Sequence, residues 1–294
     1  MASNESIIFC GPSGWSFAHE LASGRKQHPL QYVSEHFDAV EIHDSFSEAV
    51  RPELSRVWLR KVERNENFQF TAKLHRHFTH DRLLEKEEIA KYKEGLLPLL
   101  RADRFGCLLM QFPWSFRYTK ENRDFFIRLR RTFHEFPLAA EMRHASWMVD
   151  EAIGTFIDYK VAFCNIDQPT YTKAMPPTAF LTSSVGYVRL HGRNAFNWFG
   201  ADRSAATKHR YDYLYSDTEL ADWKNRIDRI SGFASKVFVI TNNDAGAKAM
   251  VNGLQLRSLL RGSDGRDVPP EILRRCPSRS QGVLFSQYSG RAVA

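Results

Sequence analysis

Eight short apolar runs, spaced about 25 to 50 residues apart, restrict the fold of this chain more than any other feature of its sequence. Most are solid runs of Ile, Val, Leu, Phe and Ala, without the polar alternation of a strand that is buried on one face only. This pattern is typical of parallel strands that are covered on both faces. The predicted strands are residues 7–10, 39–42, 68–74, 106–112, 138–140, 161–166, 185–190 and 236–240.

Seven or eight segments with helical spacing separate these runs. Pro52 suits the first turn of a helix over residues 52–65, and Ser216-Asp217-Thr218-Glu219 has the form of a capping box before another helix. Eight strand–helix units within about 250 residues predict a single-domain α/β protein, a (β/α)8 TIM barrel over residues 5–260. An open doubly wound sheet is the competing fold, but no GxGxxG motif follows the first strand.

Two segments fall outside the strand–helix repeat. Residues 191–215 form a long aromatic and basic insertion after the seventh strand. The insertion has three interpretations: a lid over a small substrate, a surface that contacts the bases and phosphates of a nucleic acid, or a loop packed on its own aromatic rings. Residues 261–294 are a basic tail with frequent Gly, Ser and Pro, which we expect to be largely disordered or loosely packed.

Composition narrows the class of protein. No window approaches the roughly 18 uninterrupted apolar residues of a membrane span, and the first residues lack the pattern of a signal peptide. The four cysteines are far apart and form no CxxC pair, so we expect free thiols in a reducing cytoplasm. The net charge of +7 permits an anionic partner, although it also fits a soluble basic protein. The sequence leaves the oligomeric state open.

A polar side chain follows every predicted strand. Because all strands of a parallel barrel end at one rim, these side chains are expected to meet there. They are Ser13, Trp15, Glu41, His43, Lys73, Gln111, Glu141, Arg143, His144, Asp167, Arg189, His191, Asn242, Asn243 and Asp244. Any one of them could belong to an ion pair that only supports the wall, such as Glu41 with Lys73. Polar groups at all eight ends favour a functional site, since apolar groups would fill a structural rim at lower cost.

The residue types indicate a chemistry. Carboxylates and imidazoles can transfer protons if their neighbours separate their pKa values, and the candidates for catalysis are Glu41, Glu141, His144, Asp167 and His191. Cationic, aromatic and amide side chains suit a phosphate or carboxylate. The candidates for substrate binding are Trp15, Lys73, Arg143, Arg189, Asn242 and Asn243.

A divalent metal is a further possibility at the rim. Its potential ligands are Glu41, Glu141, Asp167 and His191, but the nearby basic side chains would oppose a cation, so no metal ligand is predicted and the cofactor is left open. The histidines of HRHFTH (residues 75–80) resemble a metal motif but fit capping or surface positions better. Neither a GxSxG nucleophile motif nor a GxxxxGK[ST] phosphate loop is present.

A set of motifs marks a family resemblance. GPSGW, FDAVEI, LLMQFPWSF, AAEMRHASW, YVRLHGR and TNNDAGAKAMVNGLQLR occur in this order within residues 7–260. In these motifs the chain resembles the YecE-like family, domain of unknown function 72. The resemblance implies a TIM-type barrel and no particular reaction. It marks as motif positions Glu41, Lys73, Glu141, Arg143, His144, Trp147, Asp167, Arg189, His191 and Asn243. His43 departs from the usual Asn of the family, and Pro12 replaces a hydroxyl residue.

The leading hypothesis is an enzyme of hydrolase or isomerase type that acts on a small anionic substrate, sugar-phosphate-like or phosphodiester-like, at the rim. Lys73, Arg143 and Arg189 would hold the anion, and Glu41 and Glu141 would share the acid and base roles. One alternative is a nucleic-acid-binding protein or metal-assisted nuclease, which rests on the net charge, the insertion and the Arg-rich tail. Another is a non-catalytic protein that binds a small ligand.

Overall fold

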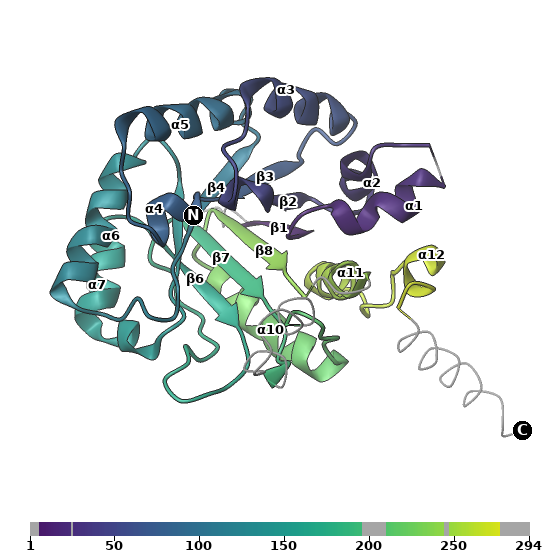
Figure 1. Cartoon of the computed structure of the whole chain (residues 1–294). Helices are drawn as coiled ribbons and strands as arrows, with labels where there is room; N and C mark the ends of the chain where they lie inside the picture. The colour runs from purple at the N-terminus through teal and green to yellow at the C-terminus, as the bar shows by residue number, and fades with distance from the viewer. Residues whose placement is uncertain (1–5, 25, 196–209, 244–246, 277–294) are drawn as a thin grey trace, which may run out of the picture.

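The computed structural model describes residues 6–24, 26–195, 210–243 and 247–276. Its eight strands are all parallel and follow the order β1-β8-β7-β6-β5-β4-β3-β2. Helices cover the outside of this curled sheet (Figure 1), so the predicted single-domain TIM barrel is confirmed. The strands are β1 (Ile7–Pro12), β2 (Ala39–Ile42), β3 (Gln69–Lys73), β4 (Phe105–Gln111), β5 (Leu138–Glu141), β6 (Ala162–Asp167), β7 (Val185–Leu190) and β8 (Lys236–Thr241).

The barrel is nearly closed between its first two strands. A single bridge joins Ser13 to Glu41, and the backbone N–H of Gly14 donates to the carbonyl of Glu41 at 2.8 Å. Gly11 lies where the strands approach most closely, because a Cβ atom there would be only 1.8 Å from the carbonyl oxygen of Ala39. A residue without a side chain is therefore required at this position.

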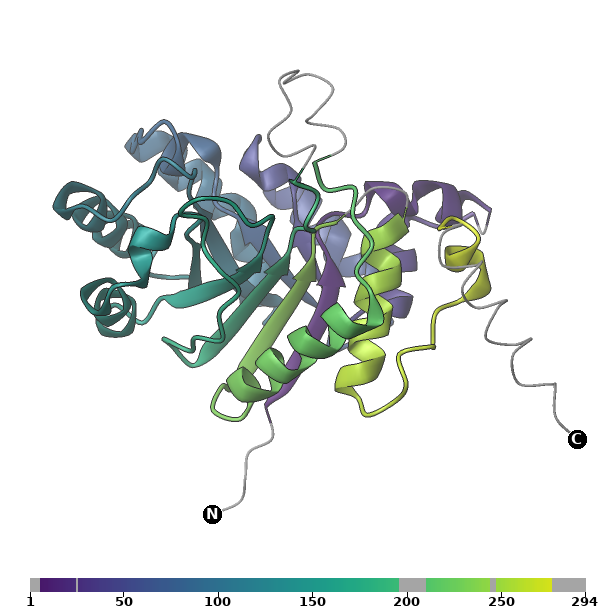
Figure 2. The same ribbon diagram turned by 90° about the horizontal axis from the view of Figure 1, so that it is seen from below.

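The longer helices lie on the outside of the strands (Figure 2), and among them are the predicted helix that begins at Pro52 and the predicted helix after the capping box. They are α2 (Pro29–His36), α3 (Pro52–Lys61), α5 (Lys86–Arg101), α6 (Lys120–Thr132), α7 (Asp150–Asp158), α10 (Asp217–Ser231) and α11 (Lys248–Leu260). The predicted capping box is present, since Ser216 and Glu219 each bond to the backbone of the other. Short helices that the sequence did not predict are η1 (Ser16–Ala18), α1 (His19–Ser23), η2 (Asp44–Phe46), α4 (Arg76–Thr79), η3 (Ala145–Met148) and α12 (Pro270–Leu273).

The beginning of the C-terminal tail packs on the barrel, in contrast to the loose packing expected of residues 261–294. This part contains α12, and Val268, Ile272 and Cys276 are all buried against the core. Of the three, only Ile272 lies in α12, while Val268 and Cys276 flank the helix on either side. Residues 277–294 of the tail and 196–209 of the insertion lie outside the described residues.

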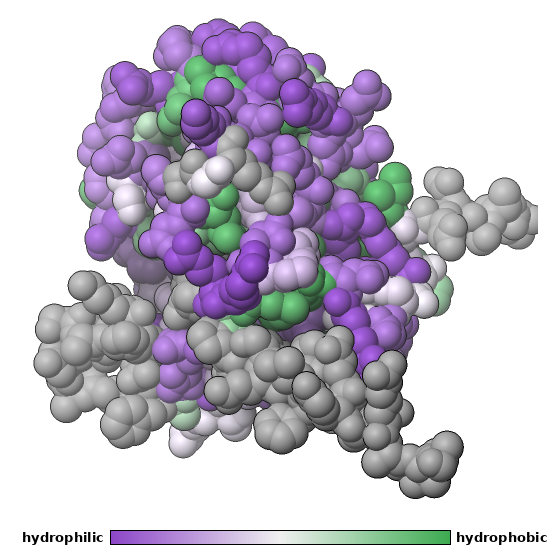
Figure 3. Space-filling view, turned by 90° about the vertical axis from the view of Figure 1, so that its right-hand side faces the viewer, coloured by the Kyte–Doolittle hydropathy of each residue, from purple (hydrophilic) through white to green (hydrophobic). Residues whose placement is uncertain are grey.

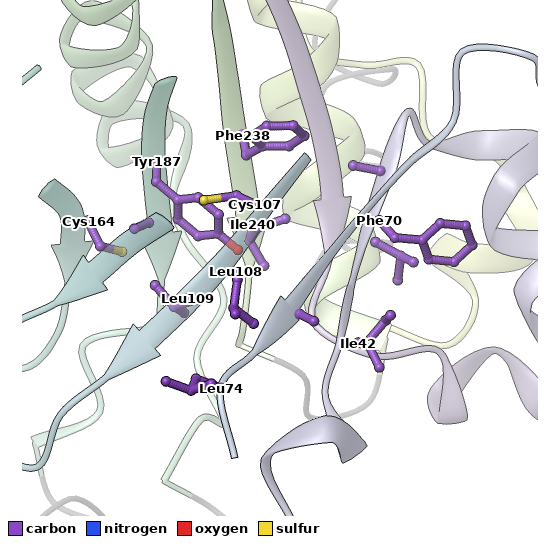
Figure 4. Packing of buried hydrophobic residues seen from close by; sticks show 14 of the residues in the cluster. Ile42, Phe70, Leu74, Cys107, Leu108, Leu109, Cys164, Tyr187, Phe238 and Ile240 are labelled. Carbon is purple, nitrogen blue, oxygen red and sulfur yellow. The ribbon is translucent and has the colours of Figure 1, made fainter. Parts of the chain in front are cut away.

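The barrel interior is filled by side chains and is not a pore. Tyr187 lies among Cys107, Leu109 and Phe238 (Figure 4), and the rings of Phe9 and Phe238 stack at 5.2 Å. The face drawn in Figure 3 is largely hydrophilic, with small apolar patches. Among the described residues, no helix has the length and apolar character needed to cross a membrane.

Candidate functional site

The alternation of side chains along each strand decides which polar strand ends meet. Successive side chains point to opposite faces, so only every second residue reaches the barrel axis. The inward-facing residues at the carboxyl ends of the strands form one bonded group, which we call the axial cluster. It consists of Ser13, Glu41, Lys73, Gln111, Glu141, Arg143, Tyr187, Arg189, His191 and Asn242.

Arg189 stands at the centre of the axial cluster and is completely buried. Its Nη2 atom donates to Oε1 of Glu41 at 2.8 Å, and its Nη1 atom donates to Oε2 of Glu141. The Nη1 atom also donates to Oε1 of Gln111 at 3.1 Å. One guanidinium therefore joins two buried carboxylates, as required to offset the cost of removing three charges from water.

Further donors saturate Glu41. The hydroxyl of Ser13 donates to its Oε1 atom at 2.7 Å, and the hydroxyl of Tyr187 donates to its Oε2 atom at 3.0 Å. Burial alone would raise the pKa of Glu41, but Arg189 and Lys73 outweigh burial and lower it. Glu41 is therefore an anion at neutral pH.

Glu141 has a similar environment. Nε of Arg143 donates to its Oε1 atom at 2.8 Å, and Nε2 of His191 lies 3.3 Å from the same oxygen. Burial would raise the pKa of Glu141, but Arg189, His191 and Arg143 hold it well below its ordinary value. Both glutamates of the cluster are thus ionised, and each is fixed by hydrogen bonds to cationic or polar groups.

His191 is held as a neutral imidazole. The amide of Asn242 donates to its Nδ1 atom at 2.9 Å, which places the ring proton on Nε2, towards Glu141. Burial lowers the pKa of His191 to about 4, and the attraction of Glu141 offsets this only in part.

Lys73 differs from the two arginines of the cluster. Its side chain is 5% exposed, and its Nζ atom donates to Nδ1 of His43 at 2.9 Å. The Oε1 atom of Glu41 lies 3.9 Å away, beyond hydrogen-bond distance. Burial and the charge of Arg189 lower the pKa of Lys73 to about 8. Burial and the Lys73 cation lower the pKa of His43 to about 4, so its ring is neutral.

Two cavities open beside the axial cluster. The larger, of about 600 Å³, is called the Arg143 cavity, and its lining residues are His80, Pro113, Trp114, Arg143, Tyr171, Thr172 and Arg210. The smaller, of about 150 Å³, is called the His43 cavity, and its lining residues are Ser13, Gly14, Trp15, Ser16, His43 and Asp44. Since Arg143 and His43 also bind cluster residues, both cavities adjoin the charged centre.

Comparison with known proteins assigns the family. The model of the family described as "Protein of unknown function DUF72" matches residues 9–273, which is most of the chain. The chain belongs to the DUF72 family. The UPF0759 protein YunF of Bacillus subtilis is 30% identical over 272 residues, covering 86% of this chain and 95% of YunF.

Solved structures of DUF72 proteins have the same fold. One from Enterococcus faecalis is 27% identical with a TM-score of 0.78, and the match covers 87% of this chain and 96% of the other. One from Thermotoga maritima is 27% identical with a TM-score of 0.75, covering 87% of this chain and 99% of the other. The family expected from the sequence motifs is therefore confirmed.

Four predicted site residues of this DUF72 protein lie outside the axial cluster. Asp167, on the helix-facing side of β6, accepts two hydrogen bonds from Nε of Arg193 at 2.9 and 3.1 Å, and burial raises its pKa despite this partner. Asn243 donates to Tyr213 and Asn252, at 2.9 Å each. Both side chains therefore hold the segment that follows β7, through Arg193 and Tyr213 respectively.

His144 is the third predicted residue that the structure does not bring into the cluster. Its Nδ1 atom accepts from the backbone N–H of Ser146 at 3.1 Å, so it caps η3. Trp15 reaches the site only as a wall of the His43 cavity, with its ring edge-to-face against Trp58 at 5.2 Å.

Sequence reasoning missed Tyr187 as a partner of the site. The signal that would have found it is the alternation itself, since Tyr187 precedes Arg189 by two residues on β7 and shares its inward face. Ser13, His43 and Gln111 were expected at the rim but were not assigned a role.

The HRHFTH histidines have local roles in the DUF72 chain. Nδ1 of His75 accepts from the backbone N–H of His77 at 3.2 Å and caps α4, as the capping interpretation predicted, and Nε2 of His77 lies 3.7 Å from Asp81. Across the described part of the chain, no group of three His, Cys, Asp or Glu residues is arranged to hold a metal ion.

Proposed function

We propose that this protein is an enzyme, of isomerase or hydrolase type, that binds a small anionic substrate at the carboxyl rim of its barrel. The observation that carries the proposal is the position of Arg143. Its guanidinium lines the 600 Å³ cavity, while its Nε atom is fixed at 2.8 Å from the buried carboxylate of Glu141. A cation that is held in place before the ligand arrives suits a phosphate or carboxylate.

The walls of the Arg143 cavity support a substrate with a ring or a compact carbon skeleton. Trp114 and Tyr171 provide aromatic faces, with ring centroids 6.2 Å apart, and Arg210 adds a second cationic side chain. Apolar walls with a few fixed polar groups are typical of small-molecule sites. These features fit the sugar-phosphate-like or phosphodiester-like substrate that the sequence suggested.

The roles of the two glutamates need revision within this proposal. A general acid must hold a proton near neutral pH, and the lowered pKa values of Glu41 and Glu141 oppose that role. Each carboxylate fits better as a fixed negative charge that orients Arg189. Glu141 also orients Arg143. Proton transfer is then left to other groups beside the cavities.

Anion binding is tested through tryptophan fluorescence, to which Trp114 in the cavity wall contributes together with the five other tryptophans of the chain. Glucose 6-phosphate and inorganic phosphate should quench the wild type saturably, and Arg143→Met should weaken binding by at least about tenfold, since it removes a charge-assisted contact. Arg117→Met is the matched control, because Arg117 lies over the Trp114 ring at 5.3 Å but does not line the cavity. Equal binding by the wild type and Arg143→Met would contradict the proposal.

Turnover requires a separate experiment. Phosphatase, phosphodiesterase and sugar-isomerase substrates would be screened with the wild type and with folded Glu141→Gln, which should lose activity because Arg143 loses its anionic anchor. An activity that Glu141→Gln retains in full would remove Glu141 from the mechanism. We also propose a cytoplasmic location, supported by four buried cysteines that form no disulfide.

A further inference from the structure

We infer that Lys73 is the reacting group of the site, and that its amine forms an imine with a carbonyl carbon of the substrate. This inference rests on the proposed function for the anionic part of the substrate. It narrows the substrate class to small aldehydes or ketones that carry a carboxylate or phosphate. It also separates the anion-binding role of Arg143 from the covalent role of Lys73.

The first support is the absence of a close carboxylate at Lys73 among the described residues. Arg143 and Arg189 each bind a glutamate within 2.8 Å, whereas the nearest carboxylate oxygen to Nζ of Lys73 is 3.9 Å away, on Glu41. Glu41 already accepts hydrogen bonds from Ser13, Tyr187 and Arg189. The cluster therefore gives each arginine a carboxylate at hydrogen-bond distance, whereas Lys73 is bonded to the neutral imidazole of His43.

The second support is the environment of the amine. Its close polar neighbour is the ring of His43, which carries no charge at neutral pH, and the cation of Arg189 disfavours a second positive charge nearby. With a pKa of about 8, roughly one Lys73 amine in ten is neutral at pH 7. Only the neutral amine is a nucleophile, and burial beside another cation is a known way to activate a lysine.

The third support is the position of Lys73 directly behind the walls of both cavities. His43, the hydrogen-bond partner of Lys73, lines the smaller cavity. On the other side, Nζ lies 5.8 Å from the centre of the Phe46 ring, and that ring packs edge-to-face on His80 at 5.2 Å, which lines the Arg143 cavity. The charge of Arg143 acts on the Lys73 amine, so the two side chains share one neighbourhood. A small substrate held by Arg143 would bring its carbonyl to Lys73 once the intervening Phe46 and His80 side chains shift.

The step balances without any redox partner. The lone pair of Nζ forms a bond to the carbonyl carbon, and the carbonyl oxygen leaves as water with the two hydrogens of the amine. The resulting imine takes one proton from solvent, and the fixed negative charge of Glu41 stabilises the iminium. An iminium withdraws electrons from the neighbouring carbon, which suits isomerisation and carbon–carbon bond cleavage.

Reductive trapping tests the inference. The full-length protein would be incubated with glyoxylate and cyanoborohydride, then digested and analysed by mass spectrometry. We expect a carboxymethyl group on Lys73, formed at least about tenfold faster at pH 8 than at pH 6 because the neutral fraction rises. Lys73→Arg should abolish this adduct with the fold intact. Lys93, whose Nζ atom lies 2.6 Å from Glu135, is the internal control and should remain largely unmodified.

Uncharged propanal and the Arg143→Met variant distinguish the imine at Lys73 from the binding of an anionic substrate by Arg143. A Lys73 adduct that forms equally well with propanal, and equally in Arg143→Met, would support the imine and overturn the anionic substrate. Saturable glyoxylate binding without an adduct on Lys73 would overturn the imine and leave the proposed function standing. Labelling of Lys93 as fast as Lys73 would also overturn the inference, because it would show ordinary amine reactivity.

Discussion

Arg189 and Glu41 lie 148 residues apart in the chain and 2.8 Å apart in the barrel, with neither side chain exposed to solvent. The bond connects β7 to β2 across the axis, and Arg189 extends the connection to Glu141 on β5. Buried charges of this kind contribute little net stability while intact, but removing one partner leaves the others unpaired in a medium of low dielectric.

Arg189→Met is therefore expected to destabilise the protein by about 3–5 kcal/mol. Urea unfolding followed by circular dichroism at pH 7 measures this change. Adding Glu41→Gln to the same chain should recover part of the loss, because one of the two stranded carboxylates is then neutral. A loss below about 1 kcal/mol in Arg189→Met would contradict the central role assigned to this guanidinium.

The glutamates should make stability depend on pH in the acid range. Both have folded-state pKa values below the ordinary value of 4.5, so their stabilising effect is complete above about pH 4.5 and is lost as the pH falls through the folded-state values. Glu141→Gln should thus be less stable than wild type at pH 7, and the difference should shrink towards pH 3. Urea titrations at both pH values check this, and a constant difference would be the contrary result.

The charge of Lys73 should destabilise the fold, in contrast to the charges of the two glutamates. Its folded-state pKa of about 8 lies below the ordinary 10.5, so the charged form is disfavoured in the fold, and this penalty is relieved as the pH rises from 8 to 10.5. Lys73→Met is expected to stabilise the protein at pH 7 by up to about 3 kcal/mol. The gain should disappear near pH 10.5.

Lys93→Met provides the control for this measurement. Lys93 is half-buried and paired with Glu135, so its loss should change stability by no more than about 1 kcal/mol. Thermal unfolding of both variants across pH 7–10.5 distinguishes the cases. If Lys73→Met were strongly destabilising at pH 7, the lysine would be a structural cation and its amine would not be poised for reaction.

Barrel closure should depend on the absence of a side chain at Gly11. A Cβ atom in Gly11→Ala would meet backbone atoms of Ala39 at 1.8 and 2.5 Å, and backbone cannot rotate away as a side chain can. We expect a loss of about 3 kcal/mol in urea unfolding. Gly154→Ala in α7 is the control, since open space surrounds that position and alanine favours a helix by about 1 kcal/mol. Equal stability of the two variants would argue against a tight β1–β2 contact.

The barrel itself could be predicted because its signals are local. Each strand is a short apolar run, and the longer helices carry caps or apolar spacing that a single window contains. Short helices such as α4 give no such signal, because four residues make little more than one turn of 3.6 residues and cannot repeat the apolar pattern. The packing of Ile272 was missed because the composition of the whole tail hides the three apolar residues that are buried against the core.

The site could be predicted only in part. The sequence shows which polar residues end the strands, but it does not show which of their side chains point towards the barrel axis. Glu41, Glu141 and Arg189 were placed correctly at one rim. Asp167 is the last residue of β6 and Asn243 follows β8 by two residues, and each lies one position away from an inward-facing residue, so its side chain turns from the axis. The pairing of Arg189 with both glutamates depends on strand order and curvature, which no local pattern contains.

The hydroxyl of Tyr187 joins two layers of the barrel, since it donates to Glu41 and accepts from Oγ1 of Thr71 at 2.9 Å. The Tyr187 ring packs among apolar side chains such as Cys107 and Phe238 (Figure 4), while its hydroxyl bonds to Glu41, the partner of Arg189. Closely packed side chains therefore fill the barrel interior on this side of the Tyr187 hydroxyl. Substitutions among the apolar residues on one side of this hydroxyl are therefore expected to act on folding, whereas substitutions among the charged residues on its other side are expected to change both the stability of the barrel and the proposed site.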